Sequence, residues 1–338
     1  MPGSSVITIG NFDGPHLGHL AILRQARRLA EVHGNASVIA LTFDPPPVRL
    51  LRPDAEPPRI ASLADRCAWL RRGGADRVEV LRPDAAMLEQ SPRAFLEEVV
   101  GRFDPAAIVE GPDFRFGRGR AGGVATLSEL GSELGFETCV VEPHRVVLSD
   151  LQEVPVSSSL VRWLVGRGRV ADAAVCLGRR FSLSAEVVQG EQRGRTLGIP
   201  TANLDAETLR PYIIPADGVY AAYAQLDATE AEGGSGPADE LHGAIMPAAV
   251  SVGVKPTFGR RALTVEAHLL DRDVDLYGRR LTLHFARWVR DQYPFPGVDA
   301  LRQQLHRDIA TVRRWAQHDP HPAPAAVAPP RPSVSVPD

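Results

Sequence analysis

Two histidines near the start of the chain have the type and spacing for phosphate chemistry. His16 and His19 lie three residues apart, so both point the same way from the first turn of a helix predicted from Leu17 onward. A short buried strand at residues 6–9 and a glycine-rich turn precede them, and the free N–H groups of a helix N-terminus bind phosphate. The two imidazoles could donate hydrogen bonds to nucleotide phosphates and stabilise the charge that develops during group transfer.

Two simpler interpretations of the pair stay open at this point. It could be part of a zinc site, although no cysteine pair at ligand spacing accompanies it, or an ordinary turn with two solvated histidines. Glycines let the backbone approach a ligand closely, so the surrounding string G-N-F-D-G-P-H-L-G-H favours the phosphate site. Its other candidate phosphate-site residues are Gly10, Asn11, Phe12, Asp13, Gly14 and Gly18.

A second candidate phosphate site lies in a glycine-rich loop that ends in Pro-Thr-Ala-Asn. Thr201 and Asn203 alternate along an extended segment, so their side chains face one side. A hydroxyl and an amide oxygen are hard ligands, suited to Mg²⁺ that bridges ATP phosphates. The family resemblance given below implies that residues of this loop bind ATP phosphates, and the candidates are Gly190, Gly194, Arg195, Gly198 and Pro200.

Glu266 is a carboxylate within an apolar predicted strand. Burial there would raise its pKa and suit it to accept a proton from an alcohol. The alternative is an edge-strand carboxylate paired with arginine or lysine. Taken alone, Glu266 fits this alternative better.

The first half of the chain alternates strand-like and helix-like segments, which predicts βαβ units on a parallel sheet. Predicted strands cover residues 6–9, 37–43, 77–81, 106–110 and 137–142, and predicted helices begin at Leu17 and cover residues 63–72, 92–102 and 124–134. Ligands of such sheets bind at the carboxyl ends of the strands. The Gly10 turn, residues 42–47 and residues 111–123 all follow strands, so one site can gather all three.

The pattern changes after two short helices predicted within residues 156–178. Strand-like segments cover residues 181–188, 218–226, 242–252, 263–270 and 281–288, which indicates an antiparallel barrel or sandwich, closed by a helix at residues 298–315. We therefore predict an α/β plus β fold, with a Rossmann-like domain at residues 1–178 and an antiparallel β-barrel domain at residues 179–318; the family resemblance given below implies that the first is a nucleotidyltransferase domain. We predict a mobile hairpin loop at residues 228–240, and a disordered tail at residues 319–338, which are rich in proline and alanine.

The composition excludes several classes of protein. A chain of 338 residues with 44% hydrophobic residues suits two domains with sizeable cores. Its net charge of -3 leaves no basic footprint for nucleic acid. The three scattered cysteines indicate a reducing compartment, and the sequence shows no leader peptide and no apolar run of membrane-spanning length. We therefore expect a cytoplasmic protein, without nucleic-acid or membrane partners, that is a monomer or a weak homo-oligomer.

Both halves together, over residues 4–316, resemble the bacterial bifunctional riboflavin kinase/FAD synthetase family. Residues 10–19 resemble its G-x-F-D-G-x-H-x-G-H signature, and the Pro-Thr-Ala-Asn box is highly specific to its flavokinase module. The resemblance implies that the C-terminal module phosphorylates riboflavin with ATP to give FMN. It also implies that the N-terminal module transfers AMP from ATP to FMN, giving FAD and pyrophosphate.

The resemblance further implies roles for single residues. In the kinase module, Glu266 matches the general base, Thr201 and Asn203 match the Mg²⁺–ATP ligands, and Arg290 matches an arginine near the flavin. In the adenylyltransferase module, the two histidines match phosphate-binding histidines. A box at residues 156–162 and a glycine–aromatic loop at residues 111–117 match the family's ATP and flavin contacts through Ser158, Ser159, Arg162, Asp113, Phe114 and Phe116. The phenylalanines could stack on the isoalloxazine ring, and core packing is an equally open alternative.

Pro46 departs from the family pattern, because it stands where the family's T-F-x-P-H-P string has a histidine that helps to hold ATP. Two alternatives to the bifunctional enzyme therefore stay open. One is a monofunctional riboflavin kinase whose adenylyltransferase half has decayed, and the other is a non-catalytic flavin- or nucleotide-binding regulatory protein. The intact Thr201, Asn203 and Glu266 argue against the second.

Overall fold

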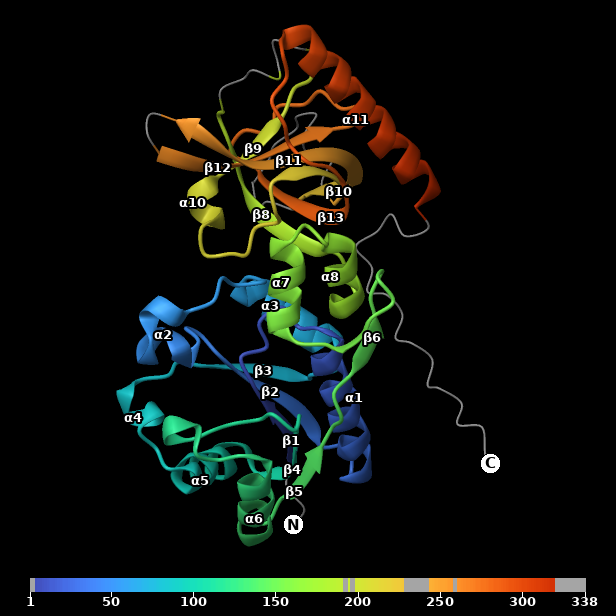
Figure 1. The fold of residues 1–338 in the computed structure, drawn as a ribbon. Helices are drawn as coiled ribbons and strands as arrows, with labels where there is room; N and C mark the ends of the chain where they lie inside the picture. Colours follow the sequence, from blue (N-terminus) through green and yellow to red (C-terminus); the bar gives the residue numbers. More distant parts are fainter. Residues whose placement is uncertain (1–3, 191–193, 195–197, 228–242, 258–259, 320–338) are drawn as a thin grey trace, which may run out of the picture. The chain divides into compact units, whose positions relative to one another are not determined.

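A computed structural model describes residues 4–190, 194, 198–227, 243–257 and 260–319 of the chain. The chain divides by its internal contacts into two compact units, Met1–Ser158 and Ser159–Asp338. Figure 1 shows the helices and strands of both units. The functional boundary near residue 178 stays a prediction.

A parallel sheet of five strands forms the centre of the first unit, in the order β3–β2–β1–β4–β5. The strands are β1 (Ser5–Ile9), β2 (Ser37–Phe43), β3 (Arg77–Leu81), β4 (Pro105–Glu110) and β5 (Glu137–Val140). This order confirms the predicted Rossmann-like α/β architecture. The chain changes direction across the sheet between β1 and β4, and ligands of such sheets bind outside the carboxyl ends of the two strands at this switch point.

Helices cover both faces of the sheet because successive strand residues point to opposite sides. Val6, Val38 and Ala107 pack against α1 (Leu17–Val32) and α3 (Leu63–Arg72). Ile7, Ile39 and Ile108 pack on the other face against α5 (Pro92–Phe103), which Ser91 caps as predicted, and α6 (Val124–Leu134). Short elements that the sequence did not predict complete the unit: α2 (Pro47–Leu51), α4 (Ala85–Leu88), 3-10 turns at Pro53–Ala55 and Arg118–Arg120, and a hairpin of β6 (Arg145–Val147) and β7 (Glu153–Pro155).

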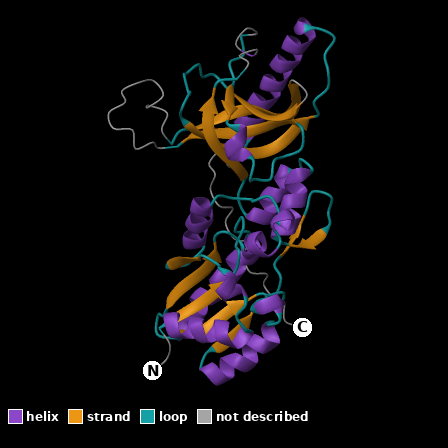
Figure 2. Cartoon of the chain, turned by 90° about the vertical axis from the view of Figure 1, so that its left-hand side faces the viewer, coloured by secondary structure: helices purple, strands orange, loops and turns teal. Residues whose placement is uncertain are grey.

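The second unit is a closed antiparallel barrel in the order β10–β11–β12–β9–β8–β13, so the barrel alternative is confirmed over the sandwich (Figure 2). Its strands are β8 (Phe181–Val188), β9 (Ala202–Leu204), β10 (Gly218–Leu226), β11 (Ile245–Thr257), β12 (Arg260–Leu269) and β13 (Arg280–Arg290). Helices α7 (Ser158–Gly166) and α8 (Val170–Leu177) precede the barrel, and the short helix α10 (Ala206–Leu209) follows β9.

The predicted closing helix is α11 (Val298–His318), whose buried Val312 packs against the barrel residue Ala221. Just after it, Asp319 accepts hydrogen bonds from Arg180 Nη2 (2.5 Å) and from the Tyr223 hydroxyl (2.9 Å). Its side chain is only 9% exposed, so Asp319 belongs to the barrel unit rather than to the predicted tail.

The other residues of the predicted tail, and the predicted loop at residues 228–240, lie outside the described part of the chain. Within the described part, no helix is both long enough and apolar enough to cross a membrane.

Candidate active sites

His16 and His19 cap the N-terminus of α1 in the first unit. The backbone N–H of His19 donates to His16 Nδ1 (3.4 Å), and that of His16 donates to His19 Nδ1 (3.3 Å). The two rings stack with their centroids 3.6 Å apart. Because each Nδ1 accepts a backbone hydrogen bond, the pattern assigns the hydrogen of each neutral ring to Nε2. The pair can therefore present Nε2–H donors beside the positive end of the helix dipole.

Two glycines of the turn make room for neighbouring side chains. A Cβ on Gly18 would lie 3.1 Å from the His16 ring. Gly14 has φ +58°, and a Cβ there would lie 2.3 Å from Ile60. Beside it, the Asp13 carboxylate accepts hydrogen bonds from the backbone N–H groups of Ile60 (3.0 Å) and Ala61 (3.4 Å). Asp13 therefore ties the turn to an adjacent loop, so its predicted place in the phosphate site is that of a support.

Phe12 does not present its side chain to a ligand. It is 3% exposed, belongs to the core beside α1, and meets the His19 ring edge-on at 5.1 Å. A Cβ on Gly10 would lie 3.2 Å from the Phe12 ring. The prediction of Phe12 as a phosphate-site residue is therefore corrected to a packing role, because an apolar ring is more stable buried than facing phosphate.

Arg66 is a buried residue of this site that the sequence analysis missed. Its Nη1 donates to the carbonyl oxygens of Asn11 (2.9 Å) and Phe43 (2.9 Å), and its Nη2 to Asp44 Oδ1 (3.3 Å). The guanidinium therefore holds together the carboxyl ends of β1 and β2. An arginine on the inner face of a predicted helix was the only indication in the sequence. Pro46, the family departure, is the N-cap residue of α2 in the same segment.

The loop after β4 carries the predicted flavin contacts. Phe116 is 6% exposed and packs in the core with Phe95, so its predicted stacking on a flavin is corrected to core packing. Phe114 is half-buried and stacks on Phe116 with ring centroids 5.3 Å apart, and Asp113 is exposed. Asp113 and Phe114 therefore stay candidates.

The box at residues 156–162 is divided between the two units. Ser158 Oγ donates to the carbonyl oxygen of Asp13 (2.8 Å), which brings it to the phosphate turn. Ser159 is exposed and Arg162 is half-buried on α7, in the second unit. Their contact with ATP stays a prediction.

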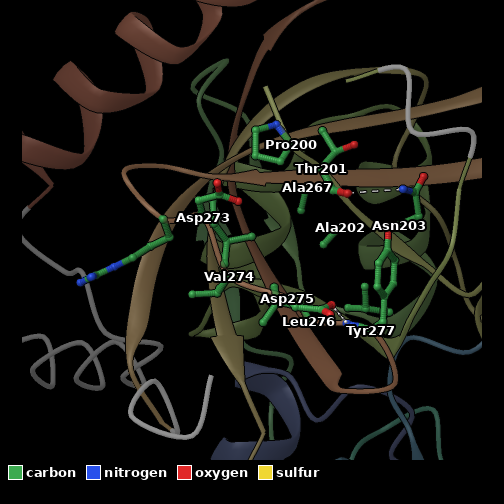
Figure 3. Close-up of a pocket in the computed structure, with 13 residues that line it drawn as sticks. Pro200, Thr201, Ala202, Asn203, Ala267, Asp273, Val274, Asp275, Leu276 and Tyr277 are labelled. Atoms are coloured by element: carbon green, nitrogen blue, oxygen red, sulfur yellow. Dashed lines mark hydrogen bonds between the residues drawn. The ribbon is translucent and has the colours of Figure 1, made fainter. Parts of the chain in front are cut away.

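A pocket opens on the barrel unit between β9 and the loop after β12 (Figure 3). Pro200, Thr201 and Asn203 line one side, and residues 272–277 line the other. The structure therefore brings together three of the predicted kinase-site residues. Tyr277 and Asp275 of the opposite wall belong to a string that the sequence analysis had not assigned a role.

Two glycines of the glycine-rich segment, Gly190 and Gly194, lie close to Asn203 and Thr201. A Cβ on Gly190 would lie 2.5 Å from the Asn203 amide, and a Cβ on Gly194 would lie 3.3 Å from Thr201 Oγ1. Gly198 has φ +76°, which favours glycine at the end of the loop. Arg195, which was predicted to bind phosphate, lies outside the described residues.

Glu266 lies directly opposite Asn203 on β9 and directly opposite Ser251 on β11. Residues paired in this way have Cβ atoms about 5 Å apart on one face of the sheet. The side chain is half-buried rather than buried, so the argument that burial prepares it as a base is corrected. Glu266 also does not line the pocket, whereas its neighbour Ala267 does. Its position beside Asn203 is what connects it to the kinase site.

Arg290 is engaged in an ion pair with α11. Its Nη2 donates to Asp308 Oδ2 (2.7 Å) and its Nε to Asp308 Oδ1 (2.9 Å), while Nη1 donates to the carbonyl oxygen of Asp291 (2.8 Å). The guanidinium lies over the rings of Tyr293 and Phe295. Arg290 therefore shapes the loop after β13, and direct contact with a flavin stays a prediction.

The candidate metal ligands of this chain are oxygen donors. No three His, Cys, Asp or Glu side chains of the described residues come together to hold a metal, so among these residues the histidine pair has no further ligands for a zinc site. Thr201 and Asn203 fit a Mg²⁺ ion that arrives with ATP, since such ions keep several waters and phosphate ligands and need few protein oxygens. Asn203 Nδ2 donates toward the carbonyl of Thr201 (3.5 Å), which turns the amide oxygen away from that carbonyl.

Comparison with known proteins gives matches to both halves of the chain. A family model described as FAD synthetase matches residues 1–160, and one described as riboflavin kinase matches residues 177–316. The bifunctional riboflavin kinase/FMN adenylyltransferase of Escherichia coli (strain K12) is 32% identical over 312 residues, 92% of each chain. The protein of that name from Pseudomonas fluorescens is 33% identical over 318 residues, 94% of each chain.

One solved structure matches nearly the whole chain. It is a crystal structure described as a macrolide-efflux protein from Streptococcus pneumoniae. It is 27% identical, has a TM-score of 0.78, and the match covers 93% of this chain and 95% of that chain.

Proposed function

Because the chain belongs to the family of bifunctional riboflavin kinases/FMN adenylyltransferases, we propose that residues 179–318 carry the kinase site and residues 1–178 the adenylyltransferase site. The chain phosphorylates riboflavin to FMN and adenylylates FMN to FAD, with ATP as the donor in both reactions. Matches over both halves favour this function over a kinase alone or a non-catalytic binding protein. The observation that carries the residue assignment is that each half holds its own glycine-rich loop against a distinct set of polar side chains.

In the kinase half, Thr201 and Asn203 hold Mg²⁺–ATP under the loop at Gly190 and Gly194. The ribityl 5′-oxygen of riboflavin attacks the γ-phosphorus, and the bond from that phosphorus to the β-bridging oxygen breaks to release ADP. Glu266 takes the hydroxyl proton, for which its place beside Asn203 suits it. Positioning and charge stabilisation supply the rest of the rate.

The adenylyltransferase half needs no base, because the FMN phosphate is already anionic near neutral pH. An FMN phosphate oxygen attacks the α-phosphorus of ATP, and pyrophosphate leaves. His16 and His19 donate Nε2–H hydrogen bonds to the phosphates, and the N-terminus of α1 stabilises their charge. Ser158, Ser159 and Arg162 complete the ATP contacts, and Asp113 and Phe114 face the flavin.

Mg²⁺ enters both reactions with ATP, and its protein ligands in the kinase half are Thr201 and Asn203. Where it meets the protein, Mg²⁺ neutralises phosphate charge and helps to align the reacting oxygens. A cytoplasmic location and a monomeric or weakly oligomeric state also remain parts of this proposal.

The proposal is tested by incubating the purified protein with riboflavin, ATP and Mg²⁺ and separating FMN and FAD by chromatography over time. We expect FMN to rise first and FAD to follow. Glu266→Gln should lower FMN formation by about a hundredfold or more and leave conversion of supplied FMN to FAD unchanged.

The double variant His16→Ala with His19→Ala should show the reverse pattern, with FMN accumulating from riboflavin while FAD formation is lost. If either change abolished both activities in a folded protein, the assignment of two separate sites would be wrong. FMN accumulation without FAD in the unchanged protein, even from supplied FMN, would instead point to a lost adenylyltransferase at Pro46.

A further inference from the structure

Glu110 is a buried acid at the switch point of the parallel sheet, and the reaction described above does not use it. It is the last residue of β4, it is 4% exposed, and it follows the apolar run Ala106–Val109. The regular pairing of β1 with β4 ends at Ile7 and Ile108, so Ile9 lies beyond it. There the Ile9 backbone N–H donates to Glu110 Oε1 at 2.6 Å.

This hydrogen bond fixes the residue that precedes the phosphate turn. On the other side of β1, the Gly10 N–H donates to the carbonyl oxygen of Leu41 at 3.0 Å. The carboxyl end of β1 is therefore held by β2 through a backbone bond and by β4 through the side chain of Glu110. The hydrogen bonds that this carboxyl group accepts from described residues, from the Ile9 N–H and the Thr8 hydroxyl (3.5 Å), both go to Oε1.

The surroundings of the carboxyl group favour its neutral form. β1 presents Thr8 and Ile9 to it, β5 presents Val140 opposite it, and the charged group that acts on it is the carboxylate of Asp113. Burial raises the pKa of Glu110 well above its usual range. The hydrogen bonds from the Ile9 N–H and the Thr8 hydroxyl lower the pKa but are outweighed by burial, and the Asp113 carboxylate adds a smaller rise. A negative charge here would also lie at the strand end from which the phosphate turn begins, where it would repel the bound phosphates.

We propose that Glu110 is a positioning residue of the adenylyltransferase half that acts in its protonated form: Oε1 holds Ile9 at the start of the phosphate turn, and the Oε2 hydroxyl donates to a phosphate oxygen of the bound ligand. Both ATP and FMN carry such oxygens, so the ligand is defined here by its phosphate. The inference deepens the proposed function and rests on the placement of phosphates at Gly10–Gly14.

Three variants test this proposal through the steady-state kinetics of FAD formation from FMN. Glu110→Gln keeps an oxygen for the Ile9 N–H and an N–H in place of the Oε2 hydroxyl, but cannot ionise. Glu110→Ala removes both groups. Glu137→Gln, on the exposed start of β5, removes one negative charge from the same sheet and serves as the matched control.

We expect Glu110→Gln to keep kcat/KM within about threefold of the unchanged protein near neutral pH, and Glu110→Ala to lose about tenfold or more. A rise in KM for ATP alone would place the ATP phosphates beside Glu110, and a rise in KM for FMN alone would place the FMN phosphate there. Riboflavin phosphorylation by the same chains, and FAD formation by Glu137→Gln, should not change.

An infrared difference spectrum between the unchanged protein and Glu110→Gln tests the protonation state independently of activity, and independently of whether Glu110→Ala folds. We expect the carbonyl-stretch band of a protonated carboxylic acid in the unchanged protein and its loss in Glu110→Gln. Absence of the band, equal damage in Glu110→Gln and Glu110→Ala, or full activity of a folded Glu110→Ala would each overturn the proposal. Failure of the proposed phosphate site itself would appear separately, as normal FAD formation by the His16→Ala, His19→Ala variant.

Discussion

At the scale of single residues, Gly190 decides where the Asn203 side chain can lie. Residues with a side chain could adopt the backbone conformation of Gly190, because its φ is not in the left-handed region. A Cβ at this position, however, would lie 2.5 Å from Asn203 Cγ and Nδ2. We expect Gly190→Ala to displace the amide and to lower kcat/KM for ATP in the kinase reaction by between about tenfold and a hundredfold. FAD formation from FMN should be unchanged, as measured on the same preparation.

Gly101→Ala is the matched control for this change. No heavy atom lies within 4 Å of a Cβ at Gly101, which is in the helix α5. Kinase activity at the level of the unchanged protein in Gly190→Ala would mean that the position of Asn203 does not matter for ATP.

Glu110 also makes a prediction about stability, because burial raises the pKa of this group only in the folded chain. The pKa of a glutamate in the unfolded chain is about 4.3. Above that pH, the unfolded chain releases the proton of Glu110, whereas the folded chain keeps it. The free energy of unfolding therefore falls by up to about 1.4 kcal/mol per pH unit until the raised pKa is reached. Glutamine has no proton to release, so Glu110→Gln should gain stability relative to the unchanged protein as the pH rises from about 5 toward the raised pKa of Glu110. Denaturant unfolding at several pH values measures this difference, and a difference that stays constant with pH would contradict the prediction.

Spacing predicted those site residues whose chemistry is local in the sequence. His16 and His19 are about one helical turn apart in the sequence, and their rings stack in the structure. Thr201 and Asn203 are two strand residues apart, and both line the same pocket. Spacing could not predict that Phe116 packs in the core while Phe114 stays available to a ligand, because the position of Phe116 depends on its contact with Phe95 of the helix α5. Glu110 was missed because it ends an apolar strand and belongs to no motif.

At the scale of elements, the end of α11 is held to the barrel by a buried ion pair. Arg180 and Asp319 are 13% and 9% exposed, and Tyr223 donates to the same carboxylate. Asp319→Ala removes the buried carboxylate that both Arg180 and Tyr223 contact, so it should lower the stability of the barrel unit by about 3 kcal/mol. Thermal unfolding followed together with riboflavin kinase activity measures this loss.

Removal of residues 320–338 provides the control for Asp319→Ala, because it leaves Asp319 in place. We expect this truncated chain to melt at the same temperature as the full chain and to keep both activities. Equal stability of Asp319→Ala and the full chain would show that the other contacts of α11, such as Val312 with Ala221 and Asp308 with Arg290, hold the helix without this ion pair.

Elements with a long periodic pattern were predicted with their bounds, and so were apolar strands as short as β3, whereas the shortest elements were not predicted. The bounds predicted for α3, α6, β8 and β10 agree with the structure, since ten or so residues reveal their period. The three-residue strand β9 and the hairpin of β6 and β7 are too short to show one. β11 and β12 extend beyond their predicted ends because they pair with each other there, which is a contact that neither segment specifies alone.

At the scale of the whole molecule, the sequence predicted two architectures but not the closure of the second. Alternating segments distinguish a parallel sheet from an antiparallel one, whereas a barrel differs from a sandwich only in pairings between distant strands, such as β8 with β13. Likewise, the two family models match separate segments, residues 1–160 and 177–316. If each segment carries one activity as we propose, FMN is a free product of one site and a substrate of the other.

This separation predicts that two damaged chains can restore the complete reaction between them. Glu266→Gln makes no FMN but can use it, and the His16→Ala, His19→Ala variant makes FMN but cannot use it. A mixture of the two should convert riboflavin to FAD, with a lag that shortens as the concentration of the FMN-forming variant rises. FAD should then form at the rate of the unchanged protein once free FMN saturates the adenylyltransferase site. Added FMN should abolish the lag, and each variant alone, supplied with riboflavin, is the control. If the mixture formed no FAD while FMN accumulated in solution and supplied FMN was still converted, FMN would have to pass between the sites of one chain, and the independence of the two halves would be wrong.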